Sequence, residues 1–417
     1  MTGKILILAD DLSGAADCAV ACVRAGLRAR VCLDIGKTQA ALGARAIDLD
    51  SRHRTPTEAR QATLAARGLI GAGLLYRKID STLRGHIGVE LAATLEIAGE
   101  GSIAIVCPAY PAMGRTMTGG QVYVRGVPLN QTEIWSHDGH GAPDLGAMLS
   151  GVGLAKAHVA LAEVRGDLPS ALAKAIDAGA RALICDAESE ADMTAIAAAG
   201  LGMTGVVWAG SGGLAIPLAA ALAPGAATAA PSPARGPGPV LVVVGSASSV
   251  SRDQLDALRG DPGAILVRIA PQVLLDGPGS PGWRPASRSL VAACGKPGKD
   301  VVVAAIDPDA PFDPVNGPRL AAALGLLIGP QLARFGALVA TGGETARSVL
   351  EAAGVHSMRV EHEVEPGIPL SSLDGRTLPV VTKAGAFGGP MSLLHCVDAL
   401  RALPLASAGV SGASVGS

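Results

Sequence analysis

Short runs of valine, isoleucine and leucine alternate with alanine-rich stretches along most of the chain. Parallel strands that helices cover on both faces read as such continuous apolar runs. The pattern therefore predicts an α/β fold of largely parallel sheets flanked by helices. The expected strands lie at 4–9, 29–34, 73–78, 103–107, 182–186, 205–209, 240–244, 265–269, 301–305, 337–341 and 378–383.

One segment breaks this alternation. Residues 223–239 read APGAATAAPSPARGPGP, which can neither continue a helix nor join a central strand. Because 417 residues exceed the usual size of one domain, we expect the break to separate two domains. The predicted division is a substrate-binding domain at 1–225, a linker at 226–238, a nucleotide-binding domain at 239–405 and a flexible tail at 406–417.

Composition narrows the class of protein. Hydrophobic residues make up 49% of the chain and charged residues 17%, which predicts a folded globular protein. A formal net charge of -2 without a basic block argues against a nucleic-acid partner. The apolar stretch 214–230 contains Pro217 and Pro224 and is shorter than the roughly 20 residues of a membrane span, so we expect no membrane partner.

Seven cysteines are scattered without a CxxC pair, which favours a reducing, cytoplasmic compartment and offers no cysteine metal site. The remaining partners are small molecules. The sequence does not determine the oligomeric state or assign any residue to a metal.

Three expected strand-to-helix junctions in the second half are rich in glycine and hydroxyl residues: 245–249 (GSASS), 341–345 (TGGET) and 383–388 (KAGAFG). In a parallel sheet such junctions gather at the carboxyl ends of the strands. Glycine lets the backbone approach a phosphate, and the amino end of a helix favours anions. Each junction alone could be only a turn or a cap, but together they predict a phosphate site, with Lys383 facing the phosphate charge.

Two familiar nucleotide motifs are excluded. Gly36-Lys37-Thr38 has Val31 where the first glycine of a P-loop should stand. The glycines within 277–282 have the spacing of a dinucleotide fingerprint, but two prolines interrupt them and we expect no helix behind them. An NAD-dependent oxidoreductase is therefore the weaker alternative.

Charged residues cluster at strand ends in the first half. Asp10 and Asp11 follow the first expected strand, where either could cap a helix, accept a proton from a substrate hydroxyl or meet a metal-bound phosphate. Residues 76–86 (YRKIDSTLRGH) and the basic turn 51–54 suit a carboxylate or phosphate, although a solvated loop remains the alternative. Residues 107–132 are expected to form an extended loop over this site.

The order of these motifs resembles the four-carbon acid sugar kinase family over nearly the whole chain. The matching segments are 9–17 (ADDLSGAAD), 50–54 (DSRHR), 78–85 (KIDSTLRG), 107–116 (CPAYPAMGRT), 245–249, 341–345 and 383–388. The resemblance implies two α/β domains with the active site in the cleft between them. It also implies that ATP phosphorylates the 4-hydroxyl of a tetronate. Mg²⁺ is expected as the partner of the nucleotide, because hard oxygen ligands and phosphates suit it.

The resemblance further implies roles for individual residues. Ser13 stands where many relatives have threonine, which keeps the hydroxyl. The implied substrate contacts are Asp10, Asp11, Arg52, Lys78, Asp80, Ser81 and Arg84. The implied ATP contacts are Ser246, Ser248, Gly342, Gly343, Glu344, Thr345, Gly385 and Gly388. The expected catalytic residues are Asp11 and Asp80, either of which could accept the proton of the substrate hydroxyl.

The form of the 78–85 segment resembles the threonate and erythronate kinases more than the 3-oxo-tetronate branch of the family. We expect D-threonate as the substrate. D-erythronate and 3-oxo-tetronate are the alternatives within the family. A non-catalytic sugar-acid sensor is the alternative from another class of protein.

Overall fold

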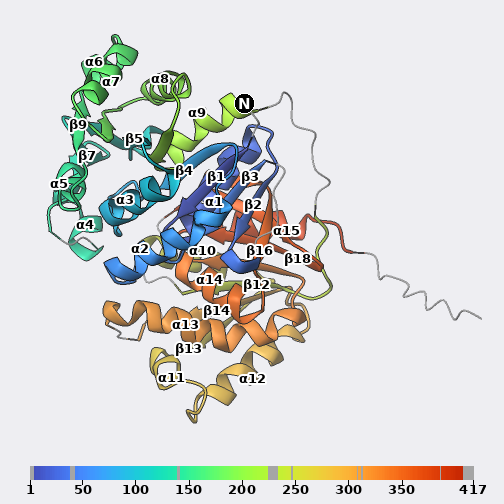
Figure 1. Ribbon diagram of the computed structural model, residues 1–417. Helices are drawn as coiled ribbons and strands as arrows, with labels where there is room; N and C mark the ends of the chain where they lie inside the picture. The colour runs from blue at the N-terminus through green and yellow to red at the C-terminus, as the bar shows by residue number, and fades with distance from the viewer. Residues whose placement is uncertain are drawn as a thin grey trace, which may run out of the picture. The chain divides into compact units, whose positions relative to one another are not determined.

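The computed structural model describes residues 4–37, 43–138, 141–223, 233–245, 248–307, 309–310, 313–385 and 387–406. The chain divides into two compact units, the first formed by 1–229 with 356–362 and the second by 230–355 with 363–417. Both units are α/β (Figure 1), which confirms the predicted fold class. A short late segment, His356–His362, thus belongs to the first unit. Most of the predicted linker and tail lies outside the described residues.

The first unit contains a sheet whose strand order is β16-β2-β3-β1-β4-β11-β5-β10-β9. Its pairings are parallel except that of β16 with β2. Strands β1, β5, β10 and β11 are uninterrupted apolar runs, as expected for strands covered on both faces. The strands are β1 (Ile5–Ala9), β2 (Ala29–Cys32), β3 (Ala44–Asp48), β4 (Leu74–Lys78), β5 (Ile103–Cys107), β9 (Lys156–Val159), β10 (Ala182–Cys185), β11 (Val206–Gly210) and β16 (Ser357–Glu365), whose last three residues belong to the second unit.

Helices cover this sheet, with α1 packed against β2, β3 and α9, and α2 against α3. Local signals set their starts: Thr55 and Glu58 form a capping box at α2, and Pro56 takes its first position. The helices are α1 (Leu12–Arg24), α2 (Pro56–Ala65), α3 (Ile87–Ala98), α4 (Glu133–Asp138), α5 (Leu145–Ser150), α6 (Leu161–Val164), α7 (Leu168–Asp177), α8 (Glu190–Leu201) and α9 (Gly212–Leu222).

The segment expected to be an extended loop contains a small antiparallel sheet, so that prediction was wrong. Its strands are β6 (Arg115–Thr118), β7 (Gln121–Val124) and β8 (Val127–Pro128). Gly119 and Gly120 both have positive φ, as do Arg125 and Gly126, which is the conformation that two-residue hairpin turns require.

The second unit has the strand order β13-β14-β12-β15-β18-β17, parallel except for the β17–β18 pair. Helices α11, α12 and α13 gather beside β13 and β14 (Figure 1). The strands are β12 (Val240–Val244), β13 (Ala264–Ile269), β14 (Val301–Ile306), β15 (Ala337–Thr341), β17 (Ile368–Leu373) and β18 (Arg376–Lys383). The helices are α10 (Ser249–Arg259), α11 (Pro271–Asp276), α12 (Trp283–Cys294), α13 (Gly317–Ile328), α14 (Gly343–Ala352) and α15 (Ser392–Arg401).

One face of this sheet packs against α10 and α15. Val339 of β15 and Val381 of β18 lie in the resulting core with Leu255 of α10 and Leu393 of α15. Because side chains alternate between the faces of a strand, the residues two positions later point to the same side. This parity directs Lys383, which follows Val381, toward α10 and α15.

The glycine-rich segment 277–282 lies between two helices, α11 and α12. The expectation that no helix follows it was therefore wrong. The segment still lacks the strand-to-helix context of a dinucleotide fingerprint, because α11 precedes it and Gly277 ends that helix with a φ of 78°.

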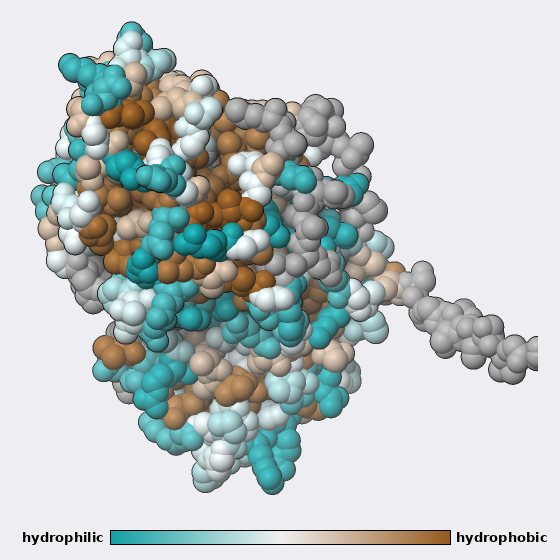
Figure 2. Space-filling model, in the orientation of Figure 1, coloured by the Kyte–Doolittle hydropathy of each residue, from teal (hydrophilic) through white to brown (hydrophobic). Residues whose placement is uncertain are grey.

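The apolar composition also reaches the surface. On the face shown in Figure 2, hydrophobic residues lie among hydrophilic ones. Among the helices that the structure describes, none is long and apolar enough to cross a membrane. The helix in the stretch that could have suggested a span, α9, is 11 residues long and contains Pro217.

Candidate active site

The order of strands in the first unit sets the place of the candidate substrate site. From β1 the chain winds to one side through β2 and β3, and then continues on the other side of β1 with β4. Ligands in open α/β sheets bind at such a change of winding direction, at the carboxyl ends of the strands. The connections after β1, β3 and β4 carry the charged residues that the sequence singled out, at 10–11, 51–52 and 80–84.

Arg52 lies at the centre of this charged cluster. Its Nε and Nη2 donate to Asp10 at 2.7 and 3.0 Å, and its Nη1 and Nη2 donate to Asp11 at 2.9 and 2.8 Å. Burial alone would lower the pKa of Arg52, but the charges of Asp10, Asp11 and Asp80 raise it well above its usual value. The planar guanidinium thus holds two carboxylates, each through two hydrogen bonds.

Asp10 and Asp11 have different surroundings. Asp10 is buried, and although burial alone would raise its pKa, Arg52 and Lys78 lower it. Asp11 is the N-cap of α1, where its Oδ1 accepts from the backbone N–H of Gly14 at 3.0 Å. The expected capping role of Asp11 and its contact with the charged cluster therefore occur together.

Asp80 is held within its own turn. Its carboxylate accepts from Arg84 Nε at 2.9 Å and Nη2 at 3.1 Å, and from the backbone N–H and hydroxyl of Thr82. Burial opposes ionisation, yet Arg84 and Arg52 hold the pKa of Asp80 well below its usual value. Ser81 lies half-buried in the same turn. An Asp80 carboxylate in this setting is a weak base.

Lys78, the last residue of β4, is buried with 5% of its surface exposed. Burial alone would lower its pKa, but acidic groups around it, among them Cys18, Asp11 and Asp10, raise it. A Cβ atom on Gly14 would lie 2.8 Å from Lys78 Nζ. The glycine of the ADDLSGAAD segment thus leaves room for this ammonium group.

A buried ion pair that the sequence analysis did not assign supports the site. Arg77 and Glu90 are fully buried and paired, and the hydroxyl of Ser51 also donates to Glu90. Alternation along β4 places Arg77 and Lys78 on opposite faces of the sheet. The pair connects β4, α3 and the turn that carries Arg52.

Sequence reasoning also missed a second polar layer in the first unit. Tyr110 donates to Asp17 at 3.3 Å, and Ser211 donates to the backbone of Ala109 at 2.7 Å. Burial lowers the pKa of Arg115, and the negative charge of Asp80 partly opposes this shift. The signal that could have revealed this layer is Gly210-Ser-Gly-Gly213, another glycine-rich junction at the end of an expected strand.

In the second unit, the junctions after β12 and β15 touch each other. A Cβ atom on Gly245 would lie 2.1 Å from Thr345 Oγ1, so only glycine fits at the end of β12. Gly342, with a φ of 96°, is the N-cap of α14, whose first residues are Gly343, Glu344 and Thr345. These residues form a tight strand-to-helix turn of the kind that accepts anions.

The junctions after β12 and β18 are also joined. Ser248, the N-cap of α10, donates to the backbone oxygen of Gly385 at 3.0 Å. Gly388 has a φ of 83° and lies against Ser392, where a Cβ atom would come within 2.3 Å of the hydroxyl oxygen. The structure thus groups Ser248, Gly385 and Gly388, while Ser246 lies outside the described residues.

Lys383 does not face outward as expected. Its Nζ donates to the backbone oxygens of Ala384, Gly385 and Phe387 at 2.8, 3.3 and 3.0 Å. The side chain is 1% exposed. The prediction that it faces phosphate charge was wrong, because strand parity turns the side chain into the unit.

The charged cluster does not form an evident metal site. Within the described ranges, no group of three or more His, Cys, Asp and Glu side chains is placed to hold a metal ion. The carboxylates of Asp10, Asp11 and Asp80 are instead engaged by Arg52 and Arg84.

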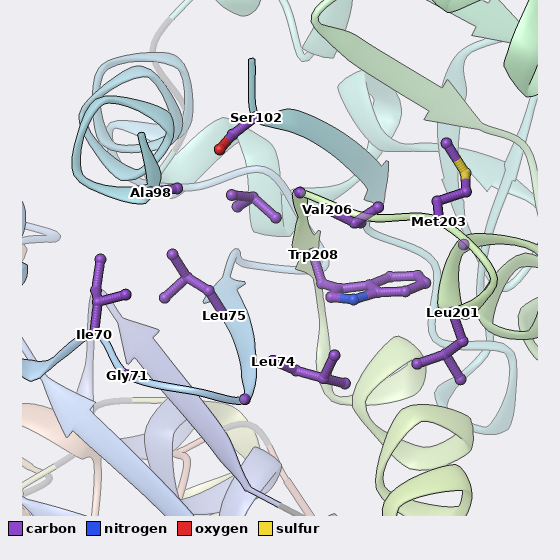
Figure 3. Close-up of a pocket in the computed structure, with 14 residues that line it drawn as sticks. Ile70, Gly71, Leu74, Leu75, Ala98, Ser102, Leu201, Met203, Val206 and Trp208 are labelled. Carbon is purple, nitrogen blue, oxygen red and sulfur yellow. The ribbon is translucent and has the colours of Figure 1, made fainter. Parts of the chain in front are cut away.

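A hollow of about 250 Å³ in the first unit lies elsewhere (Figure 3). Its walls include Leu74 and Val206, the first residues of β4 and β11, and Ser102, which precedes β5. The strands are parallel, so this hollow lies at their amino ends, on the edge of the sheet opposite the charged cluster.

Known families match both parts of the chain. Residues 5–218 match the sugar-binding N-terminal domain family, and residues 241–393 match the nucleotide-binding C-terminal domain family. A D-threonate kinase from Cupriavidus necator is 43% identical over 95% of this chain and 97% of its own length. One from Bordetella bronchiseptica is 35% identical over the same shares.

Other relatives that match over most of the chain are named D-erythronate kinase and 3-oxo-tetronate kinase. A solved structure from Haemophilus influenzae is similar in fold, with a TM-score of 0.73 and 21% identity over 95% of this chain and 100% of that one. The matches to both domain families and to the kinases confirm the resemblance seen in the motifs. The chain therefore belongs to the four-carbon acid sugar kinase family.

Proposed function

We propose that the protein uses ATP to phosphorylate the 4-hydroxyl of D-threonate, giving the 4-phosphate and ADP. The observation that carries the proposal is the cluster of Asp10, Asp11, Arg52, Lys78 and Asp80 at the switch point of the sugar-binding unit. The similarity to two relatives named D-threonate kinase supports the choice of substrate. D-erythronate is the nearest alternative.

The substrate carboxylate binds to Lys78 and Arg84 in this proposal. Arg52 is less suited, because its donors are already shared between Asp10 and Asp11. Arg84 has 31% of its side chain exposed, so it can donate to a ligand while it remains bonded to Asp80. Ser81, in the same turn, contacts a substrate hydroxyl.

Asp11 is the proposed proton acceptor, and Asp80 keeps Arg84 in position. The lowered pKa of Asp80 makes it the poorer base. The Asp11 side chain is 19% exposed and that of Asp80 is 10% exposed. In the reaction, the 4-hydroxyl oxygen bonds to the γ-phosphorus, the bond from that phosphorus to the bridging oxygen of ADP breaks, and the hydroxyl proton passes to Asp11.

The turns of the nucleotide-binding unit hold the phosphates of ATP through backbone N–H groups. Their glycines and helix starts fit such a ligand. Mg²⁺ would be bound chiefly through phosphate and water oxygens, because the carboxylates of the cluster are engaged by arginine, and it would neutralise phosphate charge. The proposed ATP contacts are Ser246, Ser248, Gly342, Gly343, Glu344, Thr345, Gly385 and Gly388. The location of the reaction in a cleft between the domains stays a prediction.

A cytoplasmic location completes the proposal. All seven cysteines are free thiols, and six of them are buried. Burial raises the pKa of Cys18, Cys107 and Cys185, which keeps these thiols protonated and poorly reactive. Such cysteines suit a reducing compartment.

ADP release tests the proposal directly. The purified protein is assayed with ATP and Mg²⁺ against D-threonate, L-threonate, D-erythronate and 3-oxo-tetronate. We expect the highest kcat/KM for D-threonate. Preference for another acid would refute the substrate assignment, whereas tight binding of the acids without ADP release would favour the sensor. Thermal stabilisation by NADH rather than ATP would favour the oxidoreductase.

A further inference from the structure

We propose that Lys383 and Gln254 are positioning residues that shape the backbone at 384–385 and 387–389 for the phosphates of the nucleotide. The inference rests on the proposed function, since it concerns the same nucleotide site. It differs from a direct phosphate contact by Lys383, which the sequence alone suggested. Its basis is the set of side-chain donors that surrounds this loop.

Lys383 supplies the first set of donors. An ammonium group has three N–H bonds, and the Nζ of Lys383 has three backbone oxygens as acceptors, those of Ala384, Gly385 and Phe387. Burial lowers the pKa of Lys383 to about 8, in keeping with a group withdrawn from water. In this arrangement no donor remains for a phosphate.

Helix α10 supplies the second set. Gln254 Nε2 donates to the backbone oxygens of Phe387 and Gly389 at 3.0 and 2.9 Å. The hydroxyl of Ser251 donates to the backbone oxygen of Gly385 at 3.0 Å. Both side chains are fully buried, so these bonds form away from water.

The two sets act on the same loop from different elements. Together they bind the backbone oxygens of Ala384, Gly385, Phe387 and Gly389. A backbone oxygen repels phosphate, whereas a backbone N–H attracts it. Turning four oxygens inward removes this repulsion from the face that meets the nucleotide. The neutral Gln254 contributes to this together with the charged Lys383.

Steady-state kinetics of Lys383→Met, Gln254→Leu and the double variant test the inference. Each single variant should raise KM for ATP about tenfold, the effect of losing buried hydrogen bonds, and leave KM for the sugar acid unchanged. The double variant should be much less impaired than the product of the two single effects, because both residues shape one loop. Lys299→Met is the matched control, since Lys299 also donates to a backbone oxygen, that of Pro262, in another turn.

Other results would contradict the role proposed for Lys383 and Gln254. If Lys383→Met lowered kcat sharply while Gln254→Leu behaved like wild type, Lys383 would contact the transferred phosphate and the inference would be wrong. Ser251→Ala removes one smaller donor and provides a milder variant if the others fail to fold; an unchanged KM for ATP in it would also count against the inference. Failure of the wild-type protein to release ADP would instead refute the proposed function.

Discussion

The two units share a winding pattern but differ in what they place at the carboxyl ends of their strands. The orders β2-β3-β1-β4 and β13-β14-β12-β15 both put the first strand in third place and the second strand at the outside. The same change of winding direction therefore occurs in each. In the first unit it carries Asp10, Asp11 and Arg52, and in the second Gly245 and Gly342.

This difference indicates two modes of recognition. A small acid offers few groups, and side chains of fixed charge can match them one by one. A phosphate chain offers many equivalent oxygens, and backbone N–H groups can bind them wherever glycine lets the chain approach. Accordingly, we expect loss of a charged side chain in the first unit to weaken binding of the sugar acid. Replacement of a glycine by alanine in the second unit should weaken binding of ATP.

The largest expected effect comes from removing the proposed base. Asp11→Asn should lower kcat about 1,000-fold, within the range of general base catalysis, and should change KM for ATP little. Single-turnover phosphorylation measures this loss, and thermal unfolding checks that the cap of α1 survives. If Asp11→Asn kept near-normal turnover while Asp80→Asn lost it, the two roles would be exchanged.

A methyl group in the second unit should have the next largest effect. Gly245→Ala places a Cβ atom against Thr345 and should raise KM for ATP at least about tenfold, the cost of a forced shift in a packed turn. Binding of D-threonate, measured by calorimetry, should persist. Gly279→Ala is the control, because a Cβ atom there meets nothing within 4 Å. Equal KM values for ATP in the two variants would contradict the proposal that backbone N–H groups bind the phosphates.

Loss of one positive charge in the first unit should raise KM for the sugar acid alone. Arg84→Gln should raise KM for D-threonate about tenfold, as expected for a charge-assisted hydrogen bond, with KM for ATP unchanged. Arg60→Gln removes an exposed arginine of α2 that pairs with Glu96 and should have no effect on either KM. A rise in KM for ATP in Arg84→Gln would contradict the expectation that charged residues of the first unit act on the sugar acid alone.

The last expected effect is on the free energy of unfolding rather than on kinetics, and it is smallest at low pH. The pKa of Asp80 is lowered in the folded state, so its ion pairs stabilise the fold above its ordinary value of 3.8, and this stability is lost as pH falls through the folded pKa. Asp80→Asn should cost about 2 kcal/mol at pH 7 after allowance for the partial exposure of Arg84, and less below pH 3.8. Urea unfolding at pH 7 and pH 3 measures both values. If Asp80→Asn lowered the free energy of unfolding as much at pH 3 as at pH 7, the lowered pKa of Asp80 would not be the source of this stability.

The sequence found the strands whose apolar runs are continuous. Each expected strand has a counterpart, and those at 103–107, 240–244 and 337–341 match to the residue. The strands that were not expected are β3, β6, β7, β8, β9, β16 and β17. In β3 the run ARAID contains two charges, and in β16 polar residues alternate with apolar ones. Such strands depend on pairing with neighbours as much as on their own propensity.

The motifs in the sequence also indicated the charged turns of the first unit and the glycine-rich turns of the second. Residue type and position after an apolar run were enough, because parallel strands carry their ends to one edge of the sheet. Those signals are local. They indicated the class of ligand for each unit, and the relatives support the family to which the motifs belong.

Only the tertiary structure determined which groups satisfy one another. It assigned Arg52 to two aspartates, buried Arg77 with Glu90 and turned Lys383 onto its own loop. It also placed His356–His362 in the first unit, although the residues on either side of this segment belong to the second. These outcomes depend on packing between distant segments, where a buried charge must find a partner and strand parity decides the direction of each side chain.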